Sequence, residues 1–167
     1  MSSIPLQVTL STESSASSNL GSATIHVAVK NTSPHPVYLL LWSSPLDPRA
    51  VAMGVVKFVS STTNTTAPFL NIKINRQAPE SGYFSMEDDH IVMIPGAGTA
   101  ERDLEAREPE VALTKGERYL AKAQGHWMGV WTYETDGEKL SMEDGLFGQF
   151  ESNAIEIEIP AEGGEEL

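Results

Sequence analysis

The sequence contains no cysteine, and this absence removes several classes of chemistry. Disulfide bonds, thiolate catalysis and cysteine-based zinc sites all need that residue. A small cysteine-free domain fits a reducing compartment, although secreted proteins also exist without cysteine. Cysteine usage alone therefore leaves the location of the protein open.

Long apolar runs are absent as well. No stretch approaches the roughly 20 apolar residues of a membrane-spanning helix. The segment from Met1 to Ser18 has neither the basic nor the apolar region of a signal peptide. As written, the chain is expected to be cytoplasmic, or to be secreted if Met1 replaces a removed signal. The matches to the N-glycosylation sequon, Asn31-Thr32-Ser33 and Asn64-Thr65-Thr66, matter only in the second case.

Basic residues are few. The chain has 11 Lys and Arg against 23 Asp and Glu, which gives a formal net charge of −12. Phosphate binding needs clustered Lys and Arg, and anionic membranes attract basic segments. We therefore expect no nucleic-acid partner and no membrane partner. The acidity suits a basic protein partner or a metal ion, or it serves solubility alone.

The sequence does have a hydrophobic period of two. Ile25, Val27 and Val29 alternate with other residues, and so do Ile155, Ile157 and Ile159, as in half-buried strands. With turn signals about every 8–15 residues, the pattern predicts an all-β fold, an immunoglobulin-like antiparallel β-sandwich of about eight or nine strands. Residues 1–160 are expected to form one domain, followed by an acidic C-terminal tail at 161–167.

Three segments receive more local predictions. The range 70–74 alternates apolar and polar residues and is predicted as a strand. The range 105–113 could hold one helical turn. The range 134–150 contains glycine and many acidic residues, and is predicted as an irregular loop.

Motifs for catalysis are missing. The four histidines lack helical zinc spacing, and no serine lies in a Gly-x-Ser-x-Gly elbow. No glycine-rich phosphate loop is present either. We predict a protein that is not an enzyme and that binds no cofactor and no metal, although a triad can assemble from distant residues.

Two groups of residues remain as candidates. Asp88, Asp89 and His90 follow Glu87 and form a local cluster of metal-ligating types, for which a solvated acidic turn is the alternative. The second group could line a small-molecule pocket or a cofactor-free active site, with core packing as the alternative. Its members are His126, Trp127, Trp131 and Tyr133.

Five segments in order resemble a known family. They read VAVKNTSPHPVYLLLWSSPLD (residues 27–47), FLNIKINRQAP, MEDDHIVMIPGAGTAERDLE, LTKGERYLAKAQGHW and FESNAIEIEI. Together they are similar to the N-terminal prodomain of fungal deuterolysin-type (aspzincin) zinc metallopeptidases, over roughly residues 4–160. The peptidase half with its zinc-binding helix has no counterpart in this sequence. The resemblance therefore implies a free-standing prodomain-like protein without peptidase activity.

A prodomain templates the folding of its enzyme or occupies the active-site cleft, and both are binding functions. The resemblance thus implies a zinc metallopeptidase as partner, which the protein would bind, inhibit or chaperone. The candidate partner-binding residues are Trp42, Asp47, Asp88, Asp89 and His90. Two of them have structural alternatives: Trp42 as a core anchor, and Asp47 as a turn residue that accepts hydrogen bonds from nearby backbone amides. The oligomeric state stays open.

Overall fold

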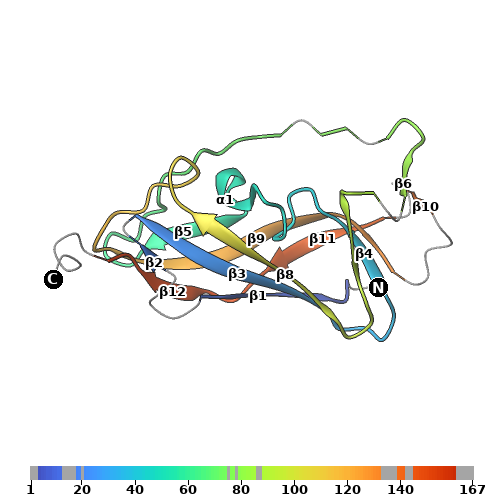
Figure 1. Ribbon diagram of the computed structural model, residues 1–167, viewed down its shortest axis with the longest axis horizontal. Helices are drawn as coiled ribbons and strands as arrows, with labels where there is room; N and C mark the ends of the chain where they lie inside the picture. The colour runs from blue at the N-terminus through green and yellow to red at the C-terminus, as the bar shows by residue number, and fades with distance from the viewer. Residues whose placement is uncertain are drawn as a thin grey trace.

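The protein is a sandwich of two antiparallel sheets, seen in the computed structural model in Figure 1. The structure describes residues 4–12, 18–19, 21–74, 76–77, 79–85, 88–132, 139–141 and 145–160. Apolar side chains from both sheets form one large buried cluster between them, which we call the main core. The predicted all-β, antiparallel fold class is confirmed.

The first sheet is built on one long strand. Strand β3 (Ser22–Asn31) pairs with β1 (Leu6–Ser11), β2 (Ser18–Asn19) and β8 (Thr99–Ala106). Alternate residues of β3, including Ile25, Val27 and Val29, are fully buried in the main core. The predicted alternation of this strand is therefore confirmed.

The second sheet is organised around β9 (Arg118–Trp131). Strand β9 pairs with β5 (Val56–Ser60), β4 (Val37–Leu40), β12 (Ile155–Glu158) and β11 (Leu146–Glu151). Strand β7 (Ile91–Ile94) extends the sheet by pairing with β4. The predicted loop at 134–150 is thus wrong in part, because the short strand β10 (Lys139–Ser141) and most of β11 lie within it, while residues 134–138 and 142–144 lie outside the described part of the chain.

A third layer covers one end of the second sheet. Strand β6 (Tyr83–Ser85) pairs with β10 (Lys139–Ser141), and the pair lies at the end of the sandwich in Figure 1. It closes a second, smaller apolar cluster, which we call the end cluster. Its buried members are Leu40, Phe84, Trp131 and Leu140. Strands β2, β6 and β10 are only two or three residues long. If these three short strands are left out, the number of remaining strands agrees with the predicted eight or nine.

A β-bulge in β9 decides which face each aromatic residue of that strand occupies. Leu146 of β11 pairs with Val130, but Gly148 pairs with Trp127, so two residues of β9 lie opposite Phe147 alone. Such an extra residue reverses the alternation of side chains along the strand. Trp127 consequently packs in the main core and Trp131 in the end cluster.

Helical structure is minimal. Helix α1 (Ala50–Met53) lies in the connection between β4 and β5 and was not predicted from the sequence. No helix within the described ranges is long and apolar enough to cross a membrane. In the range 105–113, where one helical turn was predicted, β8 continues to Ala106 and a single turn follows, in which the Val111 amide donates to the Arg107 carbonyl at 3.1 Å; no helix forms there.

The connection from β5 to β6 runs along the outside of the sandwich (Figure 1). Its predicted strand at 70–74 is wrong: Leu70 and Ile74 are 44% and 38% exposed, and the segment joins no sheet. The segment is still anchored, because the Leu70 amide donates to the Glu110 carbonyl and the Ile72 amide donates to the Ala52 carbonyl. We call residues 67–77 the strap.

Candidate functional site

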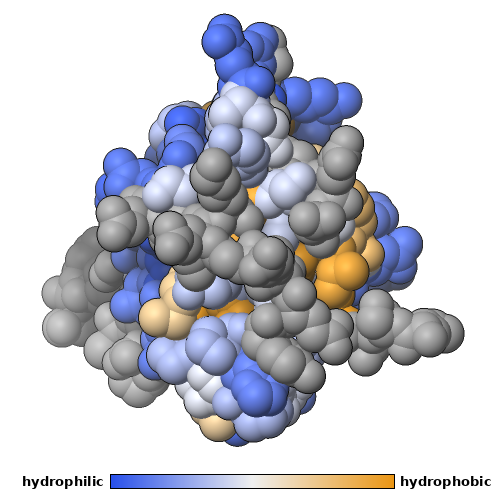
Figure 2. Space-filling model, turned by 90° about the vertical axis from the view of Figure 1, so that its right-hand side faces the viewer, coloured by the Kyte–Doolittle hydropathy of each residue, from blue (hydrophilic) through white to orange (hydrophobic). Residues whose placement is uncertain are grey.

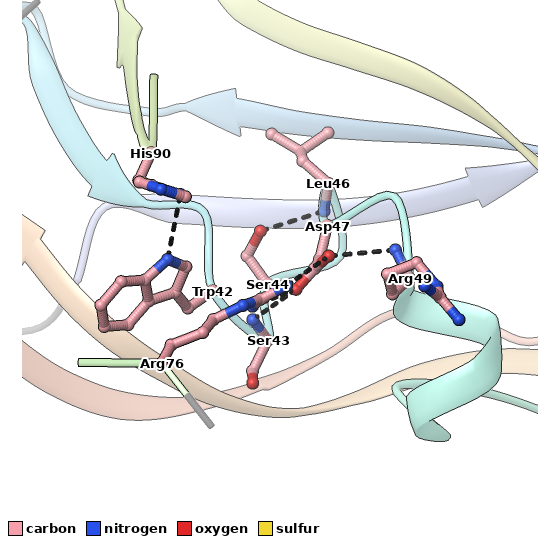
Figure 3. A network of polar contacts seen from close by, with 8 residues as sticks. All are labelled: Trp42, Ser43, Ser44, Leu46, Asp47, Arg49, Arg76 and His90. Atoms are coloured by element: carbon pink, nitrogen blue, oxygen red, sulfur yellow. Dashed lines mark hydrogen bonds and ion pairs between the residues drawn. The ribbon is translucent and has the colours of Figure 1, made fainter. Parts of the chain in front are cut away.

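A buried carboxylate organises the loop between β4 and α1. Asp47 has no exposed surface, and its oxygens accept hydrogen bonds from the backbone amides of Ser43 at 2.9 Å and Arg49 at 3.0 Å. The guanidinium of Arg76, on the strap, donates to both carboxylate oxygens at 2.7 and 3.3 Å. Figure 3 shows this two-pronged contact. The pair ties the strap to the loop.

The electrostatics of Asp47 follow from these contacts. Burial by itself raises the pKa of a carboxyl group, but the hydrogen bonds from Arg76, Arg49 and Ser43 favour the ionised form. Their sum holds the pKa of Asp47 below its usual value of 3.8. The same contacts hold Ser43 in a left-handed conformation with φ of 58°, which a non-glycine residue adopts only when its surroundings favour it.

The prediction that Asp47 contacts a partner is therefore wrong for the folded chain. A fully buried carboxylate with four hydrogen bonds offers no group to an incoming surface. The alternative, that Asp47 accepts hydrogen bonds from nearby backbone amides, is confirmed. Sequence reasoning missed Arg76, and the only signal for it was a lone arginine within an apolar, asparagine-rich stretch.

Trp42 and His90 lie together at the end of the sandwich. The indole Nε1–H of Trp42 donates to Nδ1 of His90 at 3.1 Å, and the rings meet edge to face with centroids 5.6 Å apart. Trp42 also meets Phe84 edge to face at 5.6 Å. Trp42 is half-buried and His90 is exposed. Trp42 therefore anchors the end cluster and still shows part of its surface.

The two acidic candidates stand beside His90. Asp88 accepts a hydrogen bond from the His90 amide at 2.8 Å, which forms an Asx turn at the start of β7. Asp89 is exposed, and Glu87 lies outside the described residues. The structure thus brings Trp42, Asp88, Asp89 and His90 into one neighbourhood. We call these four residues the Trp42–His90 site.

The three described members of the predicted pocket group, His126, Trp127 and Trp131, lie in separate places. His126 is exposed, Trp127 packs against Phe150 in the main core, and Trp131 lies in the end cluster on the other side of the bulge. Tyr133 lies outside the described residues. Trp127 and Trp131 are therefore not neighbours in one pocket as predicted, because a local pattern of alternation does not reveal a bulge. Trp127 does line a groove of about 470 Å³ between β1 and β11.

A further histidine lies on the outer face of the first sheet. His26 of β3 faces Asp103 through Nδ1 at 2.7 Å and Glu101 through Nε2 at 2.6 Å, both on β8. The carboxylates of Asp103 and Glu101 accept hydrogen bonds from the His26 ring and raise the pKa of His26 above its usual value of 6.5. Each ring nitrogen faces a different carboxylate, so the three groups do not converge on one point. Within the described part of the chain, no group of three such residues is arranged to hold a metal ion.

The end of the sandwich has the surface chemistry of a contact region. Figure 2 looks onto this end and shows apolar surface bordered by hydrophilic residues. On the second sheet, Met93 and Phe147 are 49% and 63% exposed. Apolar patches with polar rims are typical of protein-binding surfaces.

The comparison with protein families agrees with this architecture. A family model described as an immunoglobulin-like domain matches residues 5–159. An uncharacterised secreted protein of Arthroderma benhamiae is 28% identical over 139 residues, which cover 80% of this chain and 67% of that protein. A crystal structure of a Bacillus subtilis lipoprotein is 14% identical, with a TM-score of 0.29, over 87% of this chain. The chain spans about a third, 33%, of that lipoprotein.

Proposed function

This chain belongs to the immunoglobulin-like domain family, and from that starting point we propose that it is a non-catalytic protein-binding domain. The proposed partner is a deuterolysin-type zinc metallopeptidase, bound through the Trp42–His90 site and thereby inhibited or chaperoned. The fold itself does not choose a function, because sandwiches of this kind serve many. The choice rests on the chemistry of this site and on the ordered prodomain-like segments.

The observation that carries the proposal is an aromatic pair held rigidly at the surface. Trp42 is fixed from two sides, by Phe84 and by His90. The loop that follows it is locked by the buried Asp47–Arg76 pair, with the Nη1–Oδ2 distance at 2.7 Å. Binding hot spots are enriched in tryptophan, and side chains held in place before binding lose little entropy when they bind.

Charge supports a basic partner surface. Asp89 is exposed next to His90, and the whole chain carries a net charge of −12. Acidic groups around an apolar contact steer a basic partner toward it and repel acidic proteins. We therefore expect the association to slow as salt concentration rises, since exposed charges are screened within about 10 Å at 0.1 M salt.

The small-molecule alternative has less support. The three described members, His126, Trp127 and Trp131, occupy separate places, and Trp127 lines a groove. That groove lies between β1 and β11. A contact surface therefore accounts for more of the exposed aromatic chemistry than a ligand cavity does.

The test is a titration of the purified protein against a deuterolysin-type metallopeptidase, followed by calorimetry and by peptide hydrolysis. Trp42→Ala and His90→Ala should each weaken binding at least tenfold, about 1.4 kcal/mol, because both remove part of the contact. Leu120→Ala is the matched control, since Leu120 is 45% exposed toward the other end of β9. An unrelated zinc peptidase is the second control. Absence of binding at micromolar concentrations would eliminate the proposal.

We also propose that the protein is secreted, as the relative from Arthroderma benhamiae is by its name. The two sequons then differ in accessibility. Asn31 has no exposed surface. Its side-chain nitrogen Nδ2, the atom that would carry a glycan, donates to the carbonyls of His35, Ile94 and Pro95 at 2.7, 3.0 and 3.1 Å. Asn64 is exposed in the turn after β5. N-glycans are carried on surface asparagines.

Expression through a fungal secretory pathway is therefore expected to add one N-glycan, at Asn64. Intact mass before and after treatment with an N-glycosidase measures the number of glycans. Asn64→Gln should remove the mass difference, and so should Thr66→Ala, which destroys the same sequon without touching the asparagine. A glycan found at Asn31 would contradict the expectation.

A further inference from the structure

We infer that His90 acts at the Trp42–His90 site as an N–H donor through Nε2, that its target is a main-chain carbonyl of the partner, and that it does not coordinate zinc. The inference rests on the proposed function and specifies its chemistry. It also replaces part of the expectation from the sequence. There, Asp88, Asp89 and His90 were candidate metal ligands.

The protonation of His90 follows from its contact with Trp42. An indole N–H can only donate a hydrogen bond, so the atom that it faces must be an acceptor. Nδ1 of His90 lies 3.1 Å from Nε1 of Trp42 and is therefore the unprotonated nitrogen. A neutral imidazole carries one proton, which must then reside on Nε2.

The other polar groups of His90 are already used. Its amide donates to Asp88 at 2.8 Å, and its carbonyl accepts a hydrogen bond from the Leu41 amide at 2.8 Å. The side chain is exposed, and no described residue is recorded as a partner of Nε2. The fold therefore fixes the backbone of His90 through two hydrogen bonds and its ring through Nδ1, and leaves one N–H for a partner.

Zinc coordination would require the opposite tautomer. A metal-bound imidazole gives up the proton of the coordinating nitrogen and donates from the other one, usually to a carboxylate or carbonyl. At His90 the proton would have to move to Nδ1, where it would face the N–H of Trp42. Two donors would then oppose each other and the Trp42–His90 hydrogen bond would be lost. The site thus disfavours zinc by its geometry.

The kind of acceptor follows from the neighbouring charges. Asp88 and exposed Asp89 lie next to His90, so a second carboxylate brought to Nε2 would be repelled. A neutral carbonyl meets no such repulsion. Extended main chain offers carbonyl and amide groups side by side, and Asp89 can accept from an amide or a basic side chain. An extended, basic segment of the partner fits both groups.

The first test uses the protein alone. Long-range 1H–15N NMR should show His90 with Nδ1 unprotonated and Nε2 protonated. Titration with zinc chloride should leave the His90 signals unchanged in the wild type. Trp42→Phe removes the indole N–H while keeping an aromatic ring, and should allow zinc to shift those signals. A proton on Nδ1, or zinc-induced shifts of His90 in the wild type, would overturn the inference and leave the proposed function standing.

The second test compares two substitutions at one position. The amide of glutamine places an N–H donor near the position of Nε2, whereas alanine offers none. With the metallopeptidase, His90→Gln should bind within about threefold of the wild type and His90→Ala at least tenfold more weakly. Equal losses in both variants would overturn the donor role. A wild-type protein that binds no peptidase would instead refute the proposed function, a result that the NMR experiment cannot produce.

Discussion

Replacement of Asp47 with alanine is expected to lower the free energy of unfolding by about 3–5 kcal/mol. The carboxylate is fully buried and accepts hydrogen bonds from two backbone amides and from Arg76. Without it, these donors lose their partner in a region from which water is largely excluded. An unsatisfied buried group costs more than the net value of the bond it has lost. The strap would also lose its attachment to the loop.

Urea unfolding followed by tryptophan fluorescence measures this effect. Arg49→Ala is the matched control, because Arg49 belongs to the same loop but its side chain is exposed, and its change should stay within about 0.5 kcal/mol. Arg76→Ala should approach the effect at Asp47, since it leaves a buried charge unpaired. The double variant should then cost clearly less than the sum of the two single changes. Additive losses would show that the two residues act independently.

The pH dependence of this contribution has a definite sign. The pKa of Asp47 is lower in the folded chain than its ordinary value of 3.8, so the unfolded chain takes up the proton first. The contribution is therefore fully present above pH 3.8 and is lost as pH falls through the folded-state value. The stability difference between wild type and Asp47→Ala should be constant near neutral pH and shrink only in acid. A difference that shrinks toward alkaline pH would contradict the assignment.

Replacement of Trp131 with alanine is expected to cost about 3–5 kcal/mol, the range for large aromatic side chains in a core. Trp131 has no exposed surface, lies edge to face with Phe84 at 6.4 Å, and donates from Nε1 to the Ser141 carbonyl at 2.8 Å. The ring lies so close to Gly129 that a Cβ there would come within 2.9 Å of it. The loss would open a cavity beneath the β6–β10 pair.

The location of the structural change distinguishes a defect in the end cluster from a general loss of stability. Trp131→Ala should change the NMR signals of Trp42 and His90, because Phe84 touches both Trp131 and Trp42. Trp127→Ala should be similarly destabilising but should leave those signals in place, since Trp127 packs in the main core. Met128→Ala, at a side chain 40% exposed, is the mild control. Unchanged Trp42 signals in Trp131→Ala would disprove a continuous end cluster.

The sequence alone determined most of the strands and the class of the fold. The alternation of apolar with other residues in β3 and β12 indicates that one face of each strand is buried. This pattern can be read within the strand itself, because successive side chains of a strand point to opposite faces. The strand at β7 was equally clear from its short apolar run closed by Pro95 and Gly96. The strap was misread for the same reason: its apolar residues alternate, but no neighbouring strand pairs with them.

Only the tertiary structure decided where the candidate residues act. The bulge that separates Trp127 from Trp131 exists in the pairing of β9 with β11, and no pattern within β9 encodes that pairing. Asp47 has a structural role because Arg76, which lies 29 residues away in the sequence, donates hydrogen bonds to its carboxylate. The tautomer of His90 is set by the hydrogen bond that it accepts from Trp42, which lies 48 residues away in the sequence. Residue types and alternation are properties of the chain, whereas burial, charge pairing and proton position depend on the neighbours that folding brings together.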